Sequence, residues 1–144
     1  MIITVDTNIL IAALLSKNGA SHQILRLIIN EKIKLALSTN VLLEYDDVTK
    51  RDEVLNKSKF TKEQIEDLLD LLALLAHKHE IYFRLRPNLT DENDNLFIEC
   101  AFASGSKYLI TSNVRDFENG ELKGFGFKVV TPKQFYQMWR KNYE

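Results

Sequence analysis

Residues 2–10 read IITVDTNIL, and this stretch decides the fold. The first four residues are apolar or β-branched and predict a short buried strand over residues 2–5. The strand ends at an acid, Asp6, and a helical pattern follows over residues 9–15. Because ligand sites of open α/β sheets lie at the carboxyl ends of the strands, Asp6 is a candidate site residue.

The rest of the chain continues this alternation of strand and helix. Further strands are predicted over residues 34–38, 108–111 and 128–130, and further helices over residues 20–31, from 39, over 61–77, over 93–104 and from 132. Such alternation predicts a parallel sheet with helices on both faces. The 144 residues fit one domain, residues 1–144, and no repeat or linker divides them.

Polar residues mark the predicted starts of three helices. Thr39 is the expected N-cap of the third helix. Thr61 starts the fourth, with Gln64 in the position that completes a capping box. Thr131 and Pro132 open the last helix as its N-cap and first residue.

Helix ends and connections are marked in the same way. Gly105 is the expected residue after the end of the fifth helix, where a left-handed backbone favours glycine. Residues 81–85 predict a short extended segment, and residues 113–126 are polar and contain glycine, so they predict a loop.

Composition excludes several classes of protein. Apolar residues make up 45% of the chain, which suffices for a core, yet no apolar run reaches the roughly 18 residues of a membrane span. The first residues lack the basic and apolar regions of a signal peptide. Cys100 is the single cysteine, so we expect a buried structural thiol and no internal disulfide. These features predict a cytoplasmic protein that does not contact a membrane.

The charges nearly balance, with 19 basic and 20 acidic residues, so bulk electrostatics do not indicate nucleic-acid binding. A cleft that gathers several acids would leave the remaining surface more basic. Eight basic residues are candidates for its rim: Lys50, Arg51, Lys57, Lys59, Lys62, Arg84, Arg86 and Arg115.

Acids stand at four places beside predicted strand or helix ends: Asp6, Glu44, the pair Asp91 and Asp94, and Asp116. Each has an ordinary explanation by itself, such as a turn, a solvated helix position, or capping by Asp91 with Asp94 in the first helical turn. Gathered at one edge of the sheet, they would form a pocket for a divalent cation. Mg²⁺ and Mn²⁺ prefer such hard oxygen ligands.

A cation of this kind supports the hydrolysis of phosphate esters, because it activates a water and stabilises charge on the phosphate and the leaving oxygen. Histidine ligands are not required, and His22, His77 and His79 lie away from every acid motif. No Cys/His spacing indicates zinc, and no glycine-rich loop indicates a nucleotide cofactor.

Four segments together resemble one known family. They are VDTNILIAALLS (5–16), LSTNVLLEY (37–45), TDENDNLFIECAFASGSKYLIT (90–111) and TSNVRDF (111–117). The chain resembles the PIN-domain proteins, and among them the VapC-like ribonucleases that are the toxins of toxin–antitoxin pairs. This resemblance extends over most of the chain and implies a three-layer α/β/α sandwich with a central, mostly parallel sheet.

The resemblance also implies a role for each acid. Asp6, Glu44 and Asp94 match the three main acids of the family. Asp116 matches a fourth acid in relatives with an N-x-x-D-F pattern, whereas other relatives have an aspartate where this chain has Asn113. Whether the site holds one metal ion or two depends on this fourth position.

Other residues are expected to support these acids. Asn8 matches the polar residue beside the first acid, and Asp91 is expected to cap a helix near the site. Thr111, Ser112 and Asn113 would position the acids or the substrate phosphate.

The leading hypothesis is therefore an endoribonuclease that depends on Mg²⁺ or Mn²⁺ and cleaves RNA phosphodiester bonds. Asp6, Asp94 and Asp116 would hold the ion, and Glu44 would ligate it or orient the attacking water. The resemblance further implies a cognate antitoxin as partner and a homodimer, to which the apolar side of the last helix would contribute.

Two alternatives remain open. The first is a catalytically weak or inactive PIN scaffold that acts as a binding module, which the amide of Asn113 in place of an acid favours. The second is an aspartyl phosphatase of the haloacid dehalogenase type, whose first strand is also followed by an acid. That family needs a second aspartate two residues later, where this chain has Asn8.

Overall fold

The computed structural model describes residues 1–78, 92–118 and 126–143. Within these residues one sheet has the strand order β3-β2-β1-β4-β5, and every pairing is parallel. The strands are β1 (Ile2–Val5), β2 (Lys34–Leu37), β3 (His77–Lys78), β4 (Tyr108–Ile110) and β5 (Lys128–Val130). Because β1 is the central strand, the residue that follows it stands in the middle of the carboxyl edge of the sheet.

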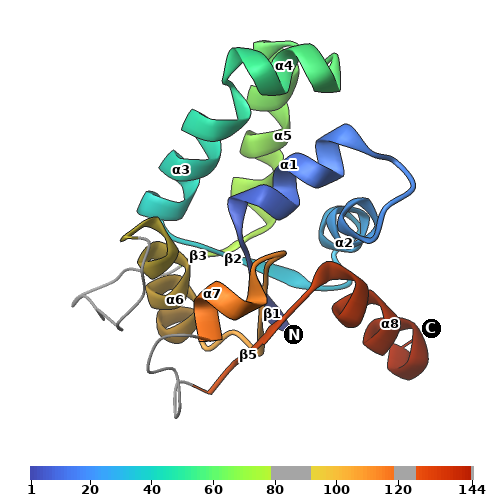
Figure 1. Ribbon diagram of the computed structural model, residues 1–144, viewed down its shortest axis with the longest axis vertical. Coiled ribbons are helices and arrows are strands. Elements are labelled where there is room, and N and C mark those ends of the chain that lie inside the picture. The colour runs from blue at the N-terminus through green and yellow to red at the C-terminus, as the bar shows by residue number, and fades with distance from the viewer. Residues whose placement is uncertain (79–91, 119–125, 144) are drawn as a thin grey trace.

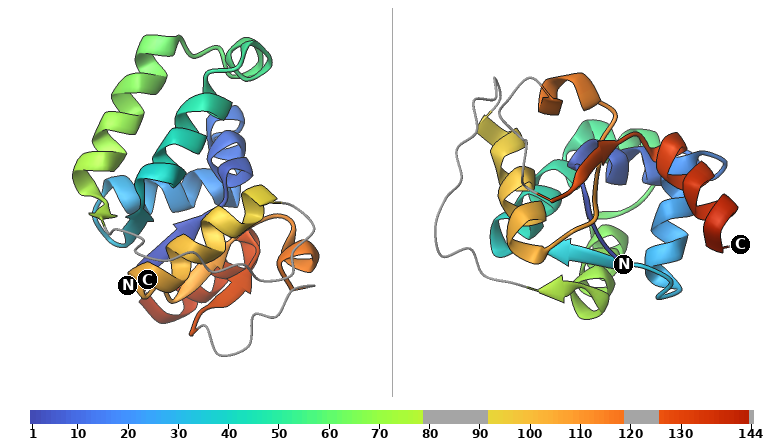
Figure 2. Two further views of the ribbon diagram at one scale, coloured as in Figure 1. Left: turned by 90° about the vertical axis from the view of Figure 1, so that its left-hand side faces the viewer. Right: turned by 90° about the horizontal axis from the view of Figure 1, so that it is seen from below.

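Helices cover both faces of this sheet (Figure 1). They are α1 (Thr7–Leu15), α2 (Ala20–Ile29), α3 (Thr39–Thr49), α4 (Asp52–Ser58), α5 (Lys62–Leu75), α6 (Glu92–Ser104), α7 (Val114–Glu118) and α8 (Pro132–Tyr143). In the right-hand view of Figure 2, α6 lies on one side of the strands, and α2 and α8 lie on the other. The predicted three-layer α/β/α sandwich with a parallel sheet is confirmed. Among the described residues no helix combines the length and the apolar character needed to cross a membrane.

The core forms around the two middle strands. Ile3 of β1 and Leu109 and Ile110 of β4 are completely buried, and helices pack over both of their faces. Phe135 of α8 meets the ring of Tyr108 edge to face, with 5.6 Å between the ring centroids. The last helix is thereby fixed to the start of β4, as the apolar side of its sequence predicts.

Two predicted helix starts are confirmed by reciprocal hydrogen bonds. At α5 the Gln64 N–H donates to Thr61 Oγ1 at 3.1 Å, and the Thr61 N–H donates to Gln64 Oε1 at 3.0 Å. At α8 the same two bonds join Thr131 and Gln134, at 3.1 and 2.9 Å. Each pair of bonds satisfies two backbone N–H groups that the start of the helix would otherwise leave without a partner.

The predicted end of α6 is confirmed as well. Gly105 has a φ of +68°, in the left-handed region that glycine adopts without strain. Its N–H donates to the Phe102 carbonyl at 3.2 Å, and the Ser106 N–H donates to the Ala101 carbonyl at 3.0 Å. These two bonds form a Schellman motif, which turns the chain from α6 towards β4.

The predicted N-cap of α3 is off by one residue. Ser38, not Thr39, accepts the Val41 N–H through its hydroxyl oxygen, at 3.2 Å. Since β2 ends at Leu37, Ser38 is the residue with extended backbone between strand and helix, whereas Thr39 is already helical. Both residues carry a hydroxyl, so composition does not distinguish them.

Three short elements differ from the sequence-based prediction. Helix α4 has no predicted counterpart, and α7 occupies part of the predicted loop over residues 113–126. Both are too short to show a clear helical period. The extended segment expected over residues 81–85 lies outside the described residues, and β3 forms just before them from the end of the segment predicted as helix.

A neutral polar cluster lies inside the core, beside β1. The hydroxyls of Thr4, Ser106 and Ser104 form a chain, with oxygen separations of 2.9 and 2.7 Å, and Ser104 donates to the Ala101 carbonyl at 3.3 Å. The Cys100 thiol lies 4.0 Å from Thr4 Oγ1, and burial raises its pKa to about 12. We call Thr4, Ser104 and Ser106 the hydroxyl cluster. The expected buried, structural Cys100 is confirmed.

Candidate active site

Asp6 stands at the carboxyl end of β1 and is 6% exposed. Its N–H donates to the Ile110 carbonyl at 2.9 Å, which extends the pairing of β1 with β4 by one residue. Its carboxylate accepts a hydrogen bond from Thr111 Oγ1 at 2.8 Å, across 105 residues of sequence. Asp6 is the residue that precedes α1, but its side chain makes no capping hydrogen bond to that helix, so capping does not explain this acid.

Thr111 orients this carboxylate from the end of β4. The residue is completely buried, and its N–H donates to the Val130 carbonyl at 2.9 Å. Its hydroxyl oxygen accepts the Asn113 N–H at 3.1 Å while its one proton goes to Asp6. The direction of the bond to Asp6 is therefore fixed by the backbone after β4. Ser112 and Asn113 are exposed at this edge.

Glu44 lies half-buried on α3, a helix that packs against both α1 and α6. The next residue, Tyr45, is buried, and its hydroxyl donates to the Val5 carbonyl at 2.5 Å. Since Val5 directly precedes Asp6, this bond holds α3 against the end of β1. Burial raises the pKa of Tyr45 far above its ordinary value, and the nearby charges of Cys100 and Asp6 add to the shift.

The other two predicted acids occupy the third residue of a helix. Asp94 is the third residue of α6, which packs against β1, β2 and β4. Asp116 is the third residue of α7, which packs against β5. In Figure 1, α3, α6 and α7 all lie to one side of the junction between β1 and α1. Among the elements that carry the four acids, α3 packs against α6, and α6 packs against β1.

Of the remaining predicted site residues, one is described by the structure and one is not. Asn8 is the second residue of α1 and is exposed, and Asp91 lies outside the described residues. Among the side chains that the structure describes, no three His, Cys, Asp or Glu groups come together as a metal site would require. The side chains of Asp94 and Asp116 are not among them, so the metal-binding set stays a prediction.

Two buried polar side chains received no role from sequence patterns. Tyr45 is one of them, because a buried tyrosine needs a partner for its hydroxyl and thereby signals a specific contact. Glu99 lies in the middle of α6 and is 2% exposed. An acid inside the apolar run IECAFA is the signal that would have identified it, because buried carboxyls are rare without specific surroundings.

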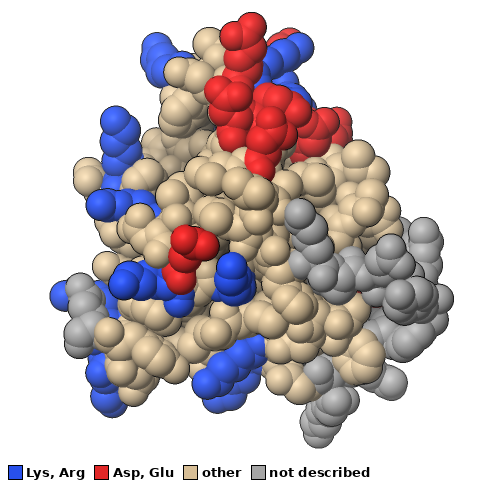
Figure 3. Space-filling view, turned by 180° about the vertical axis from the view of Figure 1, so that it is seen from behind, with Lys and Arg blue, Asp and Glu red and all other residues tan. Residues whose placement is uncertain are grey.

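The expected basic rim is only partly supported. Lys50 forms ion pairs with Asp46, at 2.5 Å, and with Glu66, while Arg51 pairs with Asp47 at 3.0 Å. Figure 3 shows acidic side chains gathered at the upper end of the molecule, where Figure 1 places α4 and α5. Lys50 and Arg51 therefore have acidic partners within the protein itself.

Three further rim candidates, Lys57, Lys59 and Lys62, are exposed in or beside α4 and at the start of α5. Arg115 is exposed on α7, at the edge that carries Asn113, and it stays a candidate for contact with a phosphate. Arg84 and Arg86 lie outside the described residues.

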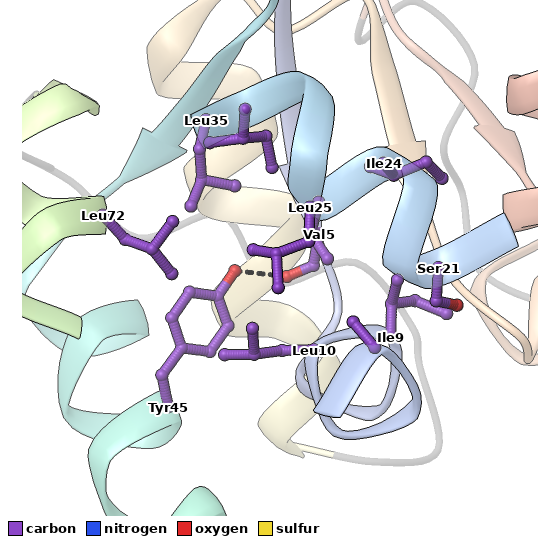
Figure 4. A pocket seen from close by; sticks show the side chains of 11 residues that line it. Val5, Ile9, Leu10, Ser21, Ile24, Leu25, Leu35, Tyr45 and Leu72 are labelled. Carbon is purple, nitrogen blue, oxygen red and sulfur yellow. Dashed lines mark hydrogen bonds between the residues drawn. The ribbon is translucent and has the colours of Figure 1, made fainter. Parts of the chain in front are cut away.

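A small cavity lies beneath the β1–α1 junction and has a volume of about 20 Å³. Most of its lining is apolar, and Tyr45 and Val5 contribute to one wall (Figure 4). A space of this size holds about one water molecule, so it is a packing defect rather than a substrate pocket.

The protein is thus an α/β sandwich with a buried acid at the carboxyl end of its central strand. This is the edge at which open α/β sheets bind their ligands. The family model described as PIN domain matches residues 3–115, more than half of the chain. The chain therefore belongs to the PIN domain family. The matched range includes Asp6, Glu44 and Asp94, and Asp116 lies just beyond it.

Two relatives extend this comparison. The uncharacterized protein MJ1680 of Methanocaldococcus jannaschii is 31% identical over 152 aligned residues, which cover 96% of this chain and 92% of that protein. A chain in the crystal structure of VapBC2 from Rickettsia felis, bound to a DNA fragment from their promoter, matches with a TM-score of 0.59 and 20% identity. That match covers 91% of this chain and 98% of the other, and it supports the fold.

Proposed function

We propose that this protein is a metal-dependent endoribonuclease whose site is built around Asp6. One observation carries the proposal: a nearly buried carboxylate stands at the carboxyl end of the central strand and is oriented by Thr111 from the neighbouring strand. Burying a charged carboxylate is costly unless its surroundings compensate. A bound cation would supply that compensation, because it neutralises the charge of the carboxylate.

The donor set fits a hard divalent cation. Asp6 presents carboxylate oxygens, and Asp94 and Asp116 would add theirs from α6 and α7, while neither histidine nor thiolate belongs to the set. Asp6, Asp94 and Asp116 would hold Mg²⁺ or Mn²⁺. A cation there would supply the activated water and the charge stabilisation that phosphodiester hydrolysis needs.

The chain's own residues would do the remaining work. Thr111 keeps the Asp6 carboxylate in one orientation, and Glu44 would orient the attacking water and accept its proton. Asn113 adds an amide oxygen without charge, so we favour a site in which Asp116 is the fourth acid. Ser112 and Asn113 are exposed and suited to contact a substrate phosphate.

RNA as the substrate, and a role as the toxin of a toxin–antitoxin pair, rest on the family. Single-stranded or looped RNA would suit such a site, because its unpaired bases and its backbone are accessible to a protein. The toxin role gains support from the fold that this chain shares with a chain of VapBC2. In that role the protein would act in the cytoplasm and would be held inactive by a cognate antitoxin.

Cleavage of structured RNAs tests the activity. The wild type, the Asp94→Asn variant and an Asp70→Asn control are each incubated with Mn²⁺ and with EDTA. Asp70 is an exposed acid on α5, so its substitution makes the same chemical change away from the proposed site. We expect cleavage by the wild type and by the control with Mn²⁺ only. Equal cleavage in EDTA, or full activity of Asp94→Asn, would show that the mechanism is wrong.

Thermal unfolding tests the cation independently of activity. A ligand that binds only the folded state stabilises it by about 2.7 kcal/mol at a concentration of 100 times its Kd. Adding Mn²⁺ or Mg²⁺ should therefore raise the melting temperature by several degrees. The same titration of Asp6→Asn should give a much smaller rise, and an equal rise in both would place the ion elsewhere.

We also propose that the protein forms a homodimer and an antitoxin complex. Trp139 and Tyr143 stack at the end of α8 with ring centroids 4.5 Å apart, and Tyr143 is 55% exposed. Exposed aromatic area of this kind suits a protein interface. Sedimentation of the purified protein, alone and co-expressed with the product of the neighbouring gene, tests both partners; a monomer in both samples would contradict them.

The inactive scaffold is the outcome that these experiments would favour if both cleavage and the metal response were absent. A protein that binds RNA without cutting it, or binds only a protein partner, would then account for the fold.

A further inference from the structure

Tyr45 lies at the meeting point of three elements. It belongs to α3, follows Glu44 directly, and is 1% exposed. Figure 4 shows its hydroxyl pointing at the Val5 carbonyl, to which it donates a hydrogen bond of 2.5 Å. Val5 is the last residue of β1 and the one before Asp6. The hydroxyl of Tyr45 is therefore bonded to the peptide group that joins Val5 to Asp6.

The Val5 carbonyl faces the side of the sheet on which β2 lies. Alternate residues of a parallel strand direct their N–H and C=O groups to the same neighbour. The Lys34 N–H donates to the Met1 carbonyl, so the odd-numbered residues of β1 face β2. The pairing of β1 with β2 extends through Ile3, and β2 then turns into α3. At Val5 the Tyr45 hydroxyl takes the place of a strand N–H.

The ring of Tyr45 reaches a third element. It stacks on the ring of Phe97, with 6.4 Å between the centroids and 30° between the planes. Phe97 is 2% exposed and lies on α6, three residues after Asp94. Residues three apart in a helix are neighbours on its surface, so this contact fixes α6 about one turn from Asp94.

Tyr45 can donate its hydrogen bond to the Val5 carbonyl only while its hydroxyl is protonated. Burial, together with the charges of Cys100 and Asp6, raises its pKa well above the ordinary value. The phenol is therefore protonated at neutral pH and can donate its hydrogen bond. The contribution from Asp6 also reflects how near the phenol is to that carboxylate.

We propose that Tyr45 is the positioning residue of the active site, joining the elements that carry Asp6, Glu44 and Asp94. Its hydroxyl fixes the end of β1, its backbone carries Glu44, and its ring fixes α6. The role depends on the proposed metal-dependent activity. Tyr45 itself does not touch the cation or the substrate, and it acts by setting the separation of groups that do.

Tyr45→Phe tests this role, because it keeps the ring and its stacking and removes only the hydroxyl. Thr49→Val is the matched control: Thr49 is a completely buried hydroxyl on the same helix, and it donates to the Tyr45 carbonyl at 2.5 Å. Phe97→Leu is the third variant, since it removes the stacking and keeps the hydroxyl. For each variant we measure kcat and KM for RNA cleavage, and the Mn²⁺ concentration that gives half of the maximal rise in melting temperature.

We expect Tyr45→Phe to lower kcat by about 10- to 100-fold, to raise the required Mn²⁺ concentration by a similar factor, and to change KM little, as losses of groups that orient metal ligands do. Phe97→Leu should show a smaller loss of the same kind. Thr49→Val should lower the melting temperature without metal but leave kcat and the Mn²⁺ requirement near those of the wild type.

Each outcome decides one question. A normal wild-type response to Mn²⁺, with equal values for Tyr45→Phe and Thr49→Val, overturns the positioning role and leaves the proposed function intact. A wild type that responds to neither Mn²⁺ nor Mg²⁺ overturns the proposed function and, with it, the role given to Tyr45. If Tyr45→Phe fails to fold, unaltered kcat and Mn²⁺ requirement in Phe97→Leu would count against the role.

Discussion

Two buried polar clusters lie along β1 and differ in charge. Thr4 belongs to the hydroxyl cluster, whose neutral groups bond to one another and to a backbone carbonyl. Asp6, two residues later, presents a carboxylate to Thr111 at the carboxyl edge of the sheet. A neutral cluster whose members are hydrogen-bonded to one another contributes to stability. A charged group at the edge of a sheet is suited to bind a ligand. The difference teaches that burial of polar groups alone does not identify a site.

The largest effect is expected from Asp6→Asn, which removes the charge and keeps the shape. We expect RNA cleavage to fall by at least about 100-fold, the upper end of the losses seen even for groups that only orient a metal ligand. The free energy of unfolding without metal should be unchanged or higher, because a buried charge is lost and Thr111 can still donate to the amide oxygen. Cleavage assays and denaturant unfolding measure both quantities. A variant that is inactive because it is strongly destabilised would contradict the contrast with the hydroxyl cluster.

A smaller effect is expected from Thr111→Val, which removes the donor that orients Asp6. We expect kcat to fall by about 10- to 100-fold, with KM nearly unchanged. Steady-state cleavage kinetics measure this, and Thr49→Val, the same replacement in α3, is the control. If both variants lose kcat equally, the loss reflects packing and not the orientation of Asp6.

A different kind of loss is expected in the neutral cluster. Ser106→Ala should lower the free energy of unfolding by about 1–2 kcal/mol, because Thr4 and Ser104 each lose a buried partner. Cleavage measured well below the melting temperature should match the wild type. Urea titration gives the first quantity. A large fall in kcat in this folded variant would contradict the assignment of the hydroxyl cluster to stability alone.

The smallest effect concerns the thiol beside the hydroxyl cluster. Burial raises the pKa of Cys100 from an ordinary 9.0 to about 12, so the thiol is protonated and unreactive in the folded protein at neutral pH. The unfolded chain ionises first, and stability from this group is therefore complete below about pH 9 and is lost as the pH rises towards 12. Alkylation at pH 8 should be slow in buffer and fast in denaturant. Rapid alkylation of the folded protein would show that the cluster opens readily.

Local signals predicted the parts of the fold that short segments determine. The capping pairs of Thr61 and Thr131 and the glycine after α6 each depend on neighbours within a few residues, and each prediction is confirmed. Ser38 displaced Thr39 as a cap because the end of β2 decided between two similar hydroxyls. Helices α4 and α7 were missed because neither is long enough to establish a period.

The sequence indicated candidate residues for the site but not the contacts that join them. A strand followed by an acid indicated Asp6, and Glu44, Asp94 and Asp116 stood beside other predicted strand or helix ends. The family resemblance then assigned a role to each acid, and the metal-binding set stays a prediction. The bond from Thr111 to Asp6 joins residues that are 105 positions apart, and the bond from Tyr45 to Val5 spans 40. Such contacts depend on how the strands are ordered, which no local pattern specifies.

The strand order also sets when the site can form during synthesis. A ribosome delivers β1 first, yet β1 borders β4, which is delivered after most of the chain. Until Thr111 has emerged, Asp6 lacks the hydroxyl that orients it, and the sheet lacks a central pairing. Domains fold as units while they are synthesised, so a chain that ends before β4 would lack a complete site. Under the proposed function, a site that depends on one of the last strands would keep an incomplete chain from cleaving RNA in the cell that makes it.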